Sequence, residues 1–179
     1  MAEFPKSVRK IEIVQQTRFG FTKELCASVV AEHKSSISDY YYILHDKENK
    51  EPHIHLLLFF FNPTPTSMIL AWFGKVINMQ CLERVKKDES AVAYLTHANV
   101  DKVKYEIDEV VCSNPDVLTK AVNSALALGN INEICRDIIN GTISERDFFT
   151  QCNGELYVKH KRKIESAFEF RYECQRKRF

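Results

Sequence analysis

The order of hydrophobic patterns along this 179-residue chain predicts an α+β fold, and three observations support that prediction. Residues 53–61 form a continuous apolar run bounded by prolines, which favours a buried central strand. Residues 39–45 form a second strand-like run, and the polar residues 46–52 between the two suit a hairpin turn. Helical patterns with capping residues stand before and after this hairpin. The chain therefore alternates between strands and helices in its first part.

The elements follow in the order β-α-β-β-α-β and then a helix. Strands are predicted at residues 9–17, 39–45, 53–61 and 80–86. Thr22 can cap a first helix, and Thr64-Pro65 favours the start of a second with proline at its first position. Asp88 can cap a third helix that runs to His97. This order is the ferredoxin-like split βαβ plan, an antiparallel sheet with helices on one face and the other face open for a site.

The rest of the chain has helical patterns only. Asn114 can cap a helix that begins at Pro115, with Gly129 just past its end. Further helices are predicted at residues 130–140, from 142 and from 155 onward. We therefore expect two parts, a domain of residues 1–110 that carries the site and a helical C-terminal region of residues 114–179.

Composition excludes several classes of protein. The chain is 45% hydrophobic with a net charge of +1, so it can build a core but has no global field for nucleic acid. No apolar stretch has the length of a membrane span, and the N-terminus lacks a secretory pattern. The six cysteines are scattered, which favours reduced thiols in the cytoplasm over a disulfide framework. We expect a cytoplasmic protein without a membrane partner.

Three histidines are predicted to meet at the hairpin. His53 and His55 are two residues apart on one strand and therefore point to the same face. The hairpin brings His45, at the end of the preceding strand, next to them. Asp46 and Glu48 stand in the turn. A single histidine on a strand is most often an ordinary surface or packed residue. Three histidines with two acids across one hairpin predict a metal site instead.

A second group of residues lies in the last helix of this domain. Tyr94 and His97 are three residues apart, so a helix would place them on one face. Alone, the pair is most simply a packed tyrosine with a surface histidine. Beside a metal site it suggests chemistry, because a divalent ion polarises a phosphate and a tyrosine hydroxyl can attack phosphorus.

These motifs together resemble a known family. The segments His45-Asp46-Lys47-Glu48, Pro52-His53-Ile54-His55 and Tyr94-Leu95-Thr96-His97 follow one another in this order. They are similar to the motifs of the rolling-circle plasmid replication initiators, the small single-tyrosine Rep proteins of the HUH endonuclease superfamily. The resemblance covers roughly residues 10–110. It implies a bacterial, metal-dependent, site-specific DNA endonuclease and strand transferase.

The resemblance also implies roles for single residues. It assigns metal binding to His45, His53 and His55, with Mn²⁺ or Mg²⁺ as the ion. The fourth ligand falls on Glu48, where the family pattern has aspartate, and Asp46 is the alternate. Tyr94 matches the nucleophile that forms a 5′-phosphotyrosine at the origin.

Residues around the tyrosine helix can assist or contact DNA. His97 can orient the phenol or the phosphate. The lysine pairs Lys86 and Lys87, and Lys102 and Lys104, are either solvated charge or phosphate contacts. Residues 155–179 carry eight Lys or Arg against four Glu, a basic excess that suits a solvated helix face or a DNA-contacting tail.

The expected partner is plasmid origin DNA, as a single strand or a hairpin with adjacent duplex. A host helicase and polymerase are further partners, and the C-terminal helices can serve DNA binding or homo-oligomerisation. Two alternatives stay open. One is a mobilisation relaxase or viral-type Rep nickase, although the chain has no Walker motif. The other is a non-enzymatic nucleic-acid-binding module, for which the aromatic strand segment Tyr40–Tyr42 can stack bases but the histidines have no role.

Overall fold

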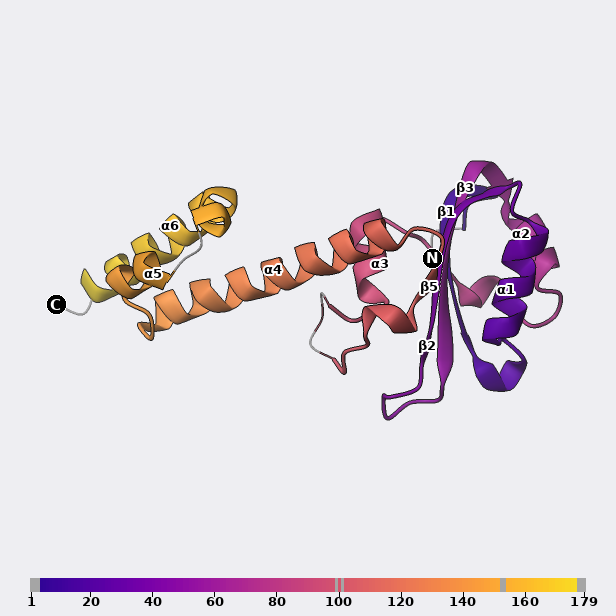
Figure 1. Ribbon diagram of the computed structural model, residues 1–179, viewed down its shortest axis with the longest axis horizontal. Helices are drawn as coiled ribbons and strands as arrows, with labels where there is room; N and C mark the ends of the chain where they lie inside the picture. Colours follow the sequence, from indigo (N-terminus) through magenta and orange to yellow (C-terminus); the bar gives the residue numbers. More distant parts are fainter. Residues whose placement is uncertain (1–3, 99, 101, 152–153, 177–179) are drawn as a thin grey trace. The chain divides into compact units, whose positions relative to one another are not determined.

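The computed structural model describes residues 4–98, 100, 102–151 and 154–176 (Figure 1). It confirms the α+β class, with an antiparallel sheet, helices packed against it and a helical C-terminal part. The chain divides into two compact units, Met1–Ala125 and Leu126–Phe179. The predicted division into residues 1–110 and 114–179 concerns whether the two parts fold and function separately. It stays a prediction.

The sheet has five strands in the order β4-β1-β3-β2-β5, all paired antiparallel. The strands are β1 (Ser7–Gln16), β2 (Ile37–His45), β3 (His53–Pro65), β4 (Leu82–Glu83) and β5 (Val111–Cys112). β3 is the central strand, as its apolar run predicts, because it pairs with β1 on one side and β2 on the other. Its side chains are buried because both faces of the sheet are covered. The predicted strand at residues 80–86 shrinks to two residues, and β5 has no signal in the sequence.

One face of the sheet is covered by α1 (Lys23–Glu32) and α2 (Thr66–Trp72) (Figure 1). Alternate strand residues such as Ile13, Ile54 and Leu56 face this side and are fully or almost fully buried. Thr22 caps α1 as predicted, its side chain accepting a hydrogen bond from the Leu25 N–H at 3.2 Å. Pro65, by contrast, stands at the N-cap of α2 and not at its first helical position.

The other face carries α3 (Asp88–Tyr94) and the first turns of α4 (Pro115–Asn140) (Figure 1). They pack on Tyr41, Ile43 and Leu57, which belong to a second buried cluster. Helices thus lie on both faces, and the face expected to be open is covered by α3 and α4. Leu57 shares the histidine face, since it is two residues after His55.

Helix α3 differs from the sequence prediction at both ends. Lys87 occupies the N-cap without a side-chain hydrogen bond, and Asp88 is the first helical residue. The Asp88 carboxylate accepts instead from Lys10 Nζ of β1 at 2.5 Å, so it ties the helix to the sheet. The helix ends at Tyr94, before His97.

In its described residues the first unit also has the short 3₁₀ turns η1 (Thr17–Phe19), η2 (Met79–Cys81) and η3 (Ile107–Glu109).

The predicted helix break at Gly129 is wrong, because α4 runs unbroken from Pro115 to Asn140. A glycine inside a helix costs only about 1 kcal/mol, which the helical residues around it outweigh. The predicted start is confirmed, with the Val117 N–H donating to Asn114 Oδ1 at 3.2 Å.

The second unit consists of the end of α4, α5 (Glu145–Gln151) and α6 (Gly154–Arg176). Gly141 follows α4 with a left-handed φ of 83°, as predicted for the residue after a helix end. The core of this unit is small and apolar: Ile131, Cys135, Ile138, Phe148, Ile164, Ala167 and Phe168. Across the described residues, no helix combines the length and apolarity needed to cross a bilayer.

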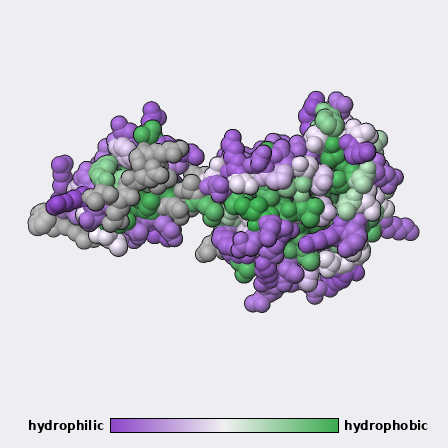
Figure 2. Space-filling view, viewed as in Figure 1, coloured by the Kyte–Doolittle hydropathy of each residue, from purple (hydrophilic) through white to green (hydrophobic). Residues whose placement is uncertain are grey.

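Hydrophilic side chains cover much of the visible surface, with hydrophobic residues gathered in a band over part of the first unit (Figure 2).

Candidate metal and nucleophile site

The hairpin of β2 and β3 brings the three predicted histidines together. The strand register sets His45 directly opposite His53, and His55 follows two residues later on the same face. One ring nitrogen from each of the three lies within 4.8 Å of the other two. This spacing lets three imidazoles bind one ion, so the hairpin forms a candidate metal centre.

Each of these rings is held by a hydrogen bond at one nitrogen. His45 Nε2 is 2.7 Å from the Leu95 carbonyl oxygen, and His53 Nδ1 is 3.0 Å from the carbonyl oxygen of Glu51. His55 Nδ1 is 2.7 Å from Glu12 Oε1 on β1. All three partners accept, so the held nitrogen carries the proton and the other keeps its lone pair. This is the arrangement that orients histidine ligands in metal sites.

His45 gives the clearest sign that a ligand fits here. Its side chain is 1% exposed, and its Nδ1 is buried with no hydrogen-bond partner among the described residues. Burial lowers the pKa of His45 to about 3, so its ring stays neutral at physiological pH. An unpaired buried acceptor costs about 1–3 kcal/mol, a cost that an ion bound at Nδ1 would remove.

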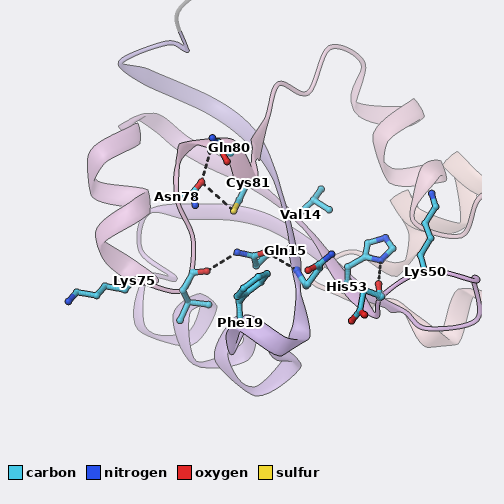
Figure 3. Close-up of a pocket in the computed structure, with 12 residues that line it drawn as sticks. Val14, Gln15, Phe19, Lys50, His53, Lys75, Asn78, Gln80 and Cys81 are labelled. Atoms are coloured by element: carbon cyan, nitrogen blue, oxygen red, sulfur yellow. Dashed lines mark hydrogen bonds between the residues drawn. The ribbon is translucent and has the colours of Figure 1, made fainter.

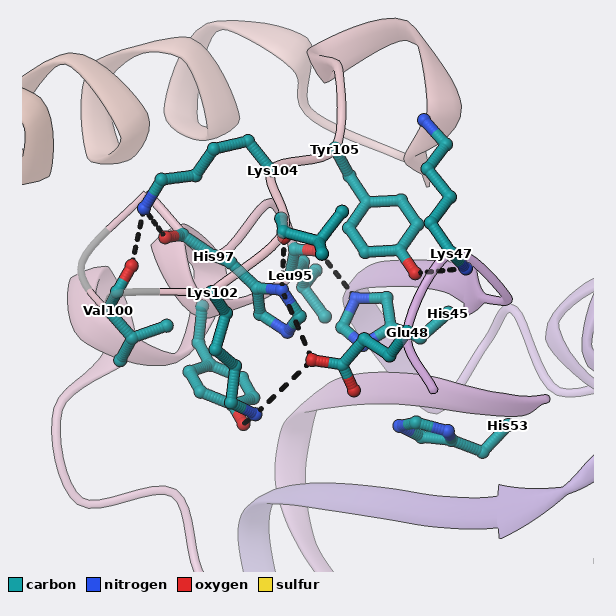
Figure 4. A network of polar contacts seen from close by, with 12 residues as sticks. His45, Lys47, Glu48, His53, Leu95, His97, Val100, Lys102, Lys104 and Tyr105 are labelled. Carbon is teal, nitrogen blue, oxygen red and sulfur yellow. Dashed lines mark hydrogen bonds and ion pairs between the residues drawn. The ribbon is translucent and has the colours of Figure 1, made fainter. Parts of the chain in front are cut away.

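The two acids of the turn differ in their surroundings. The Glu48 side chain is 10% exposed, and its Oε1 lies 3.7 Å from Lys102 Nζ and 3.9 Å from His97 Nδ1 (Figure 4). Burial raises the pKa of Glu48, but the charge of Lys102 and of nearby groups outweighs it and holds the pKa below its usual value. Asp46 is exposed. The carboxylate of Glu48 stands beside the histidine nitrogens without joining their 4.8 Å group.

Tyr94 closes the site from the end of α3. Its ring centroid lies 5.6 Å from that of His55 and 5.2 Å from that of His97. Lys102 Nζ donates to the Tyr94 hydroxyl oxygen at 2.8 Å, and this hydrogen bond is the main reason that the pKa of Lys102 is raised. A cation therefore holds the phenol oxygen of a ring that lies beside His55 and His97.

His97 joins the site by a turn and not by helical spacing. Its φ is 56°, the left-handed region that residues with a side chain seldom adopt. Its Nδ1 is 2.7 Å from the Val103 carbonyl oxygen, and its Nε2 is buried without a partner in the described part of the chain. The ring centroid lies 4.3 Å from that of His45. Lys104 Nζ contacts the carbonyl oxygens of His97 and Val100, so it stabilises this turn (Figure 4).

Two residues of the site were missed in the sequence. Glu12 holds His55, and Tyr105 stacks on His45 with centroids 4.5 Å apart at 17°. The Tyr105 hydroxyl also accepts from the Lys47 N–H at 2.9 Å, which fixes the turn between the ligands. The sequence does indicate a special role for Glu12, because it is a lone carboxylate between two isoleucines of an alternating strand. No feature of the sequence indicates a role for Tyr105.

The remaining predicted residues lie away from this centre. Lys86 and Lys87 are exposed just before α3, at the opposite end of that helix from Tyr94. Tyr41 and Tyr42 are buried in opposite clusters, which agrees with packing in the core.

The fold and the histidine cluster together define a class, an α+β domain with a candidate metal centre on an antiparallel sheet. The family model of plasmid replication proteins, origin-binding domain, matches residues 7–117. The chain belongs to this family, and the matched segment contains every residue of the site.

One relative is a "Replication protein" of Onion yellows phytoplasma (strain OY-M). It is 29% identical over 174 residues, which cover 84% of this chain and 45% of the relative. The chain therefore spans less than half the length of that relative.

Proposed function

We propose that the chain is a metal-dependent DNA nicking and closing enzyme that acts at the origin of a rolling-circle plasmid. The observation that supports this most is the Tyr94 hydroxyl, held by Lys102 beside the ring of His55. A tyrosine beside a metal-binding triad supports this proposal, because its hydroxyl can attack a phosphate bound there. Membership of a plasmid replication family favours replication over mobilisation as its role.

In this proposal His45, His53 and His55 hold a divalent ion, with Glu48 as fourth ligand and Asp46 as the alternate. The bound ion would act as a Lewis acid on the scissile phosphate. Imidazole-rich ligation favours Mn²⁺ over Mg²⁺ and also admits Zn²⁺ or Co²⁺.

The chemistry of the chain's own residues is a transesterification. The Tyr94 oxygen loses its proton and forms a bond to phosphorus, while the bond from phosphorus to the 3′ oxygen breaks and that oxygen takes up a proton. Lys102 stabilises the developing phenolate, because its ammonium donates to the same oxygen. The product is a 5′-phosphotyrosine and a free 3′-hydroxyl. Attack by a 3′-hydroxyl on this ester reverses the step and rejoins a strand.

The C-terminal region, residues 114–179, is proposed to assist origin binding or self-association. Its last helix, α6, carries six of the eight Lys and Arg of residues 155–179 and all four of their Glu. Lys177 and Arg178 of this stretch lie outside the described residues. A host helicase and polymerase would act after nicking.

Tyr94→Phe tests the nucleophile, since it removes one oxygen and leaves the ring contacts. Mixed with Mn²⁺ and a single-stranded oligonucleotide that carries the cognate nick site, the wild-type chain should cleave it and keep the downstream fragment covalently on Tyr94, located by mass spectrometry. The variant should bind Mn²⁺ and DNA but form no adduct. An adduct on Tyr40, or normal nicking by the variant, would refute the assignment.

A further inference from the structure

A groove of about 820 Å³ adjoins the candidate metal centre and has no role in the chemistry above (Figure 3). It is lined by the end of β1, the turn after it and the loop before β4. His53 forms part of its wall, so the groove begins at a ligand of the proposed ion. Whatever occupies it would lie beside the scissile phosphate.

The groove exists because β4 is short. β4 pairs with β1 only at Glu12 and Ile13, which leaves the edge at residues 14–16 without a neighbouring strand in the described structure. Hydrogen bonds hold the loop that forms the opposite wall. Gln15 Nε2 donates to the Val76 carbonyl oxygen at 3.0 Å, and Asn78 Oδ1 accepts from the Gln80 N–H at 2.8 Å. The walls are therefore built before any ligand arrives.

The lining suits a single strand of DNA. Phe19 is 53% exposed and its ring lies in the groove, where a base can stack on it (Figure 3). The side-chain amides of Gln16 and Gln80 have no hydrogen-bond partner within the described residues, so they are available to base edges. Lys50 and Lys75 flank the groove on opposite sides and can meet phosphates (Figure 3).

The one acid of the lining does not cancel this charge. Glu51 Oε1 lies 3.9 Å from Nη1 of Arg18, a residue outside the lining. The guanidinium carbon of Arg18 lies 5.0 Å from the centroid of the Phe19 ring. A cation next to an exposed aromatic ring is typical of surfaces that bind unstacked bases.

We propose that this groove binds the single-stranded DNA segment adjoining the scissile phosphate, with one base stacked on Phe19. The proposal rests on the proposed function and adds a substrate site to it. Duplex DNA does not fit this role, because its bases are stacked on one another and offer no free face to Phe19.

The test measures binding of a fluorescein-labelled oligothymidylate to the full chain by anisotropy, in EDTA so that no cleavage occurs. Stacking tolerates any base, so the cognate sequence is not needed. Phe19→Ala should weaken binding by about 5- to 150-fold, the range for loss of one base stack. A duplex of equal length should bind both proteins alike. Phe61→Ala is the matched control, because Phe61 is 58% exposed and lies eight residues along β3 from His53, about 26 Å away.

A second measurement does not depend on a variant's folding. Oligothymidylate with one 5-iododeoxyuridine, irradiated on the wild-type chain, should cross-link to Phe19. Three results would overturn the proposed binding groove. Phe19→Ala could bind as tightly as the wild type, Phe19→Ala and Phe61→Ala could lose equal affinity, or the cross-link could be confined to Phe61. Phe19-dependent binding in a chain that forms no adduct at Tyr94 would instead support the groove and overturn the nicking function.

Discussion

Substitution of Glu12 tests whether the three histidines form a metal centre. Glu12 Oε1 lies 2.7 Å from His55 Nδ1, and the two side chains are 13% and 8% exposed. Glu12→Gln keeps an oxygen that can accept from Nδ1 but removes the charge. Glu12→Ala removes the acceptor and leaves the His55 N–H unpaired. The two variants therefore separate loss of charge from loss of the hydrogen bond.

Partners of this kind contribute about 10- to 100-fold to metal affinity. We expect Glu12→Gln near the lower end and Glu12→Ala near the upper end. A buried donor without a partner costs about 1–3 kcal/mol, so Glu12→Ala should also lower the free energy of unfolding of the metal-free protein by that amount. Glu12→Gln should lower it less.

Titration calorimetry with Mn²⁺ measures the affinity, and urea unfolding in EDTA measures the stability. Glu83→Gln is the control, because Glu83 pairs directly opposite Glu12 on β4 but is exposed. If both Glu12 variants bind Mn²⁺ as tightly as the wild type, His55 is not a ligand and the proposed centre is wrong.

Two further predictions concern contacts of the site, and a third concerns a buried thiol on α1. Lys102→Met should slow formation of the Tyr94 adduct by about 10- to 100-fold, the worth of a charged hydrogen bond. The rate is measured at saturating Mn²⁺, because Lys102 also lies 3.7 Å from the proposed ligand Glu48. An unchanged rate would remove Lys102 from the chemistry. Tyr105→Phe should lower Mn²⁺ affinity, because the Lys47 N–H loses the hydroxyl that fixes the hairpin turn, while the ring still stacks on His45. An affinity equal to that of the wild type would show that the turn does not need this hydrogen bond. Burial raises the pKa of Cys26 to about 12, so the folded chain keeps this proton while the unfolded chain loses it near pH 9. The free energy of unfolding should therefore fall as pH rises above about 9, and a thiol reagent at pH 8 should label exposed Cys174 but not Cys26; rapid labelling of Cys26 in the folded chain would contradict its burial.

Local rules were enough to predict the hairpin and its histidines. Alternation along a strand places His53 and His55 on one face whatever the rest of the chain does, and a short polar turn brings His45 opposite. The same alternation places Leu57 on the histidine face. In a continuous apolar run, however, it does not show which of the two faces the helices cover. The expectation of one open face failed because α3 and α4 cover that face next to the histidines.

Where the site depends on turns, the sequence was a poorer guide. The prediction that Tyr94 and His97 share a helix face gave the right neighbours for the wrong reason. The helix ends at Tyr94, and His97 reaches the site through a left-handed residue. That conformation costs about 1–2 kcal/mol for a residue with a side chain, so other contacts must offset it. The hydrogen bond to Val103 and the Lys104 contacts with the turn do so, and both come from residues after the motif.

The same turn connects the proposed nucleophile with the proposed ligands. The Leu95 carbonyl oxygen, one residue after Tyr94, holds His45 Nε2 at 2.7 Å. Because α3 ends there, that carbonyl is no longer tied to the continuing helix and can accept from the histidine. The helix end that stops the Tyr94–His97 spacing from being helical is thus also what orients His45. A helix that continued for a further turn beyond His97 would instead bond the Leu95 carbonyl to an N–H four residues later and leave His45 without its partner.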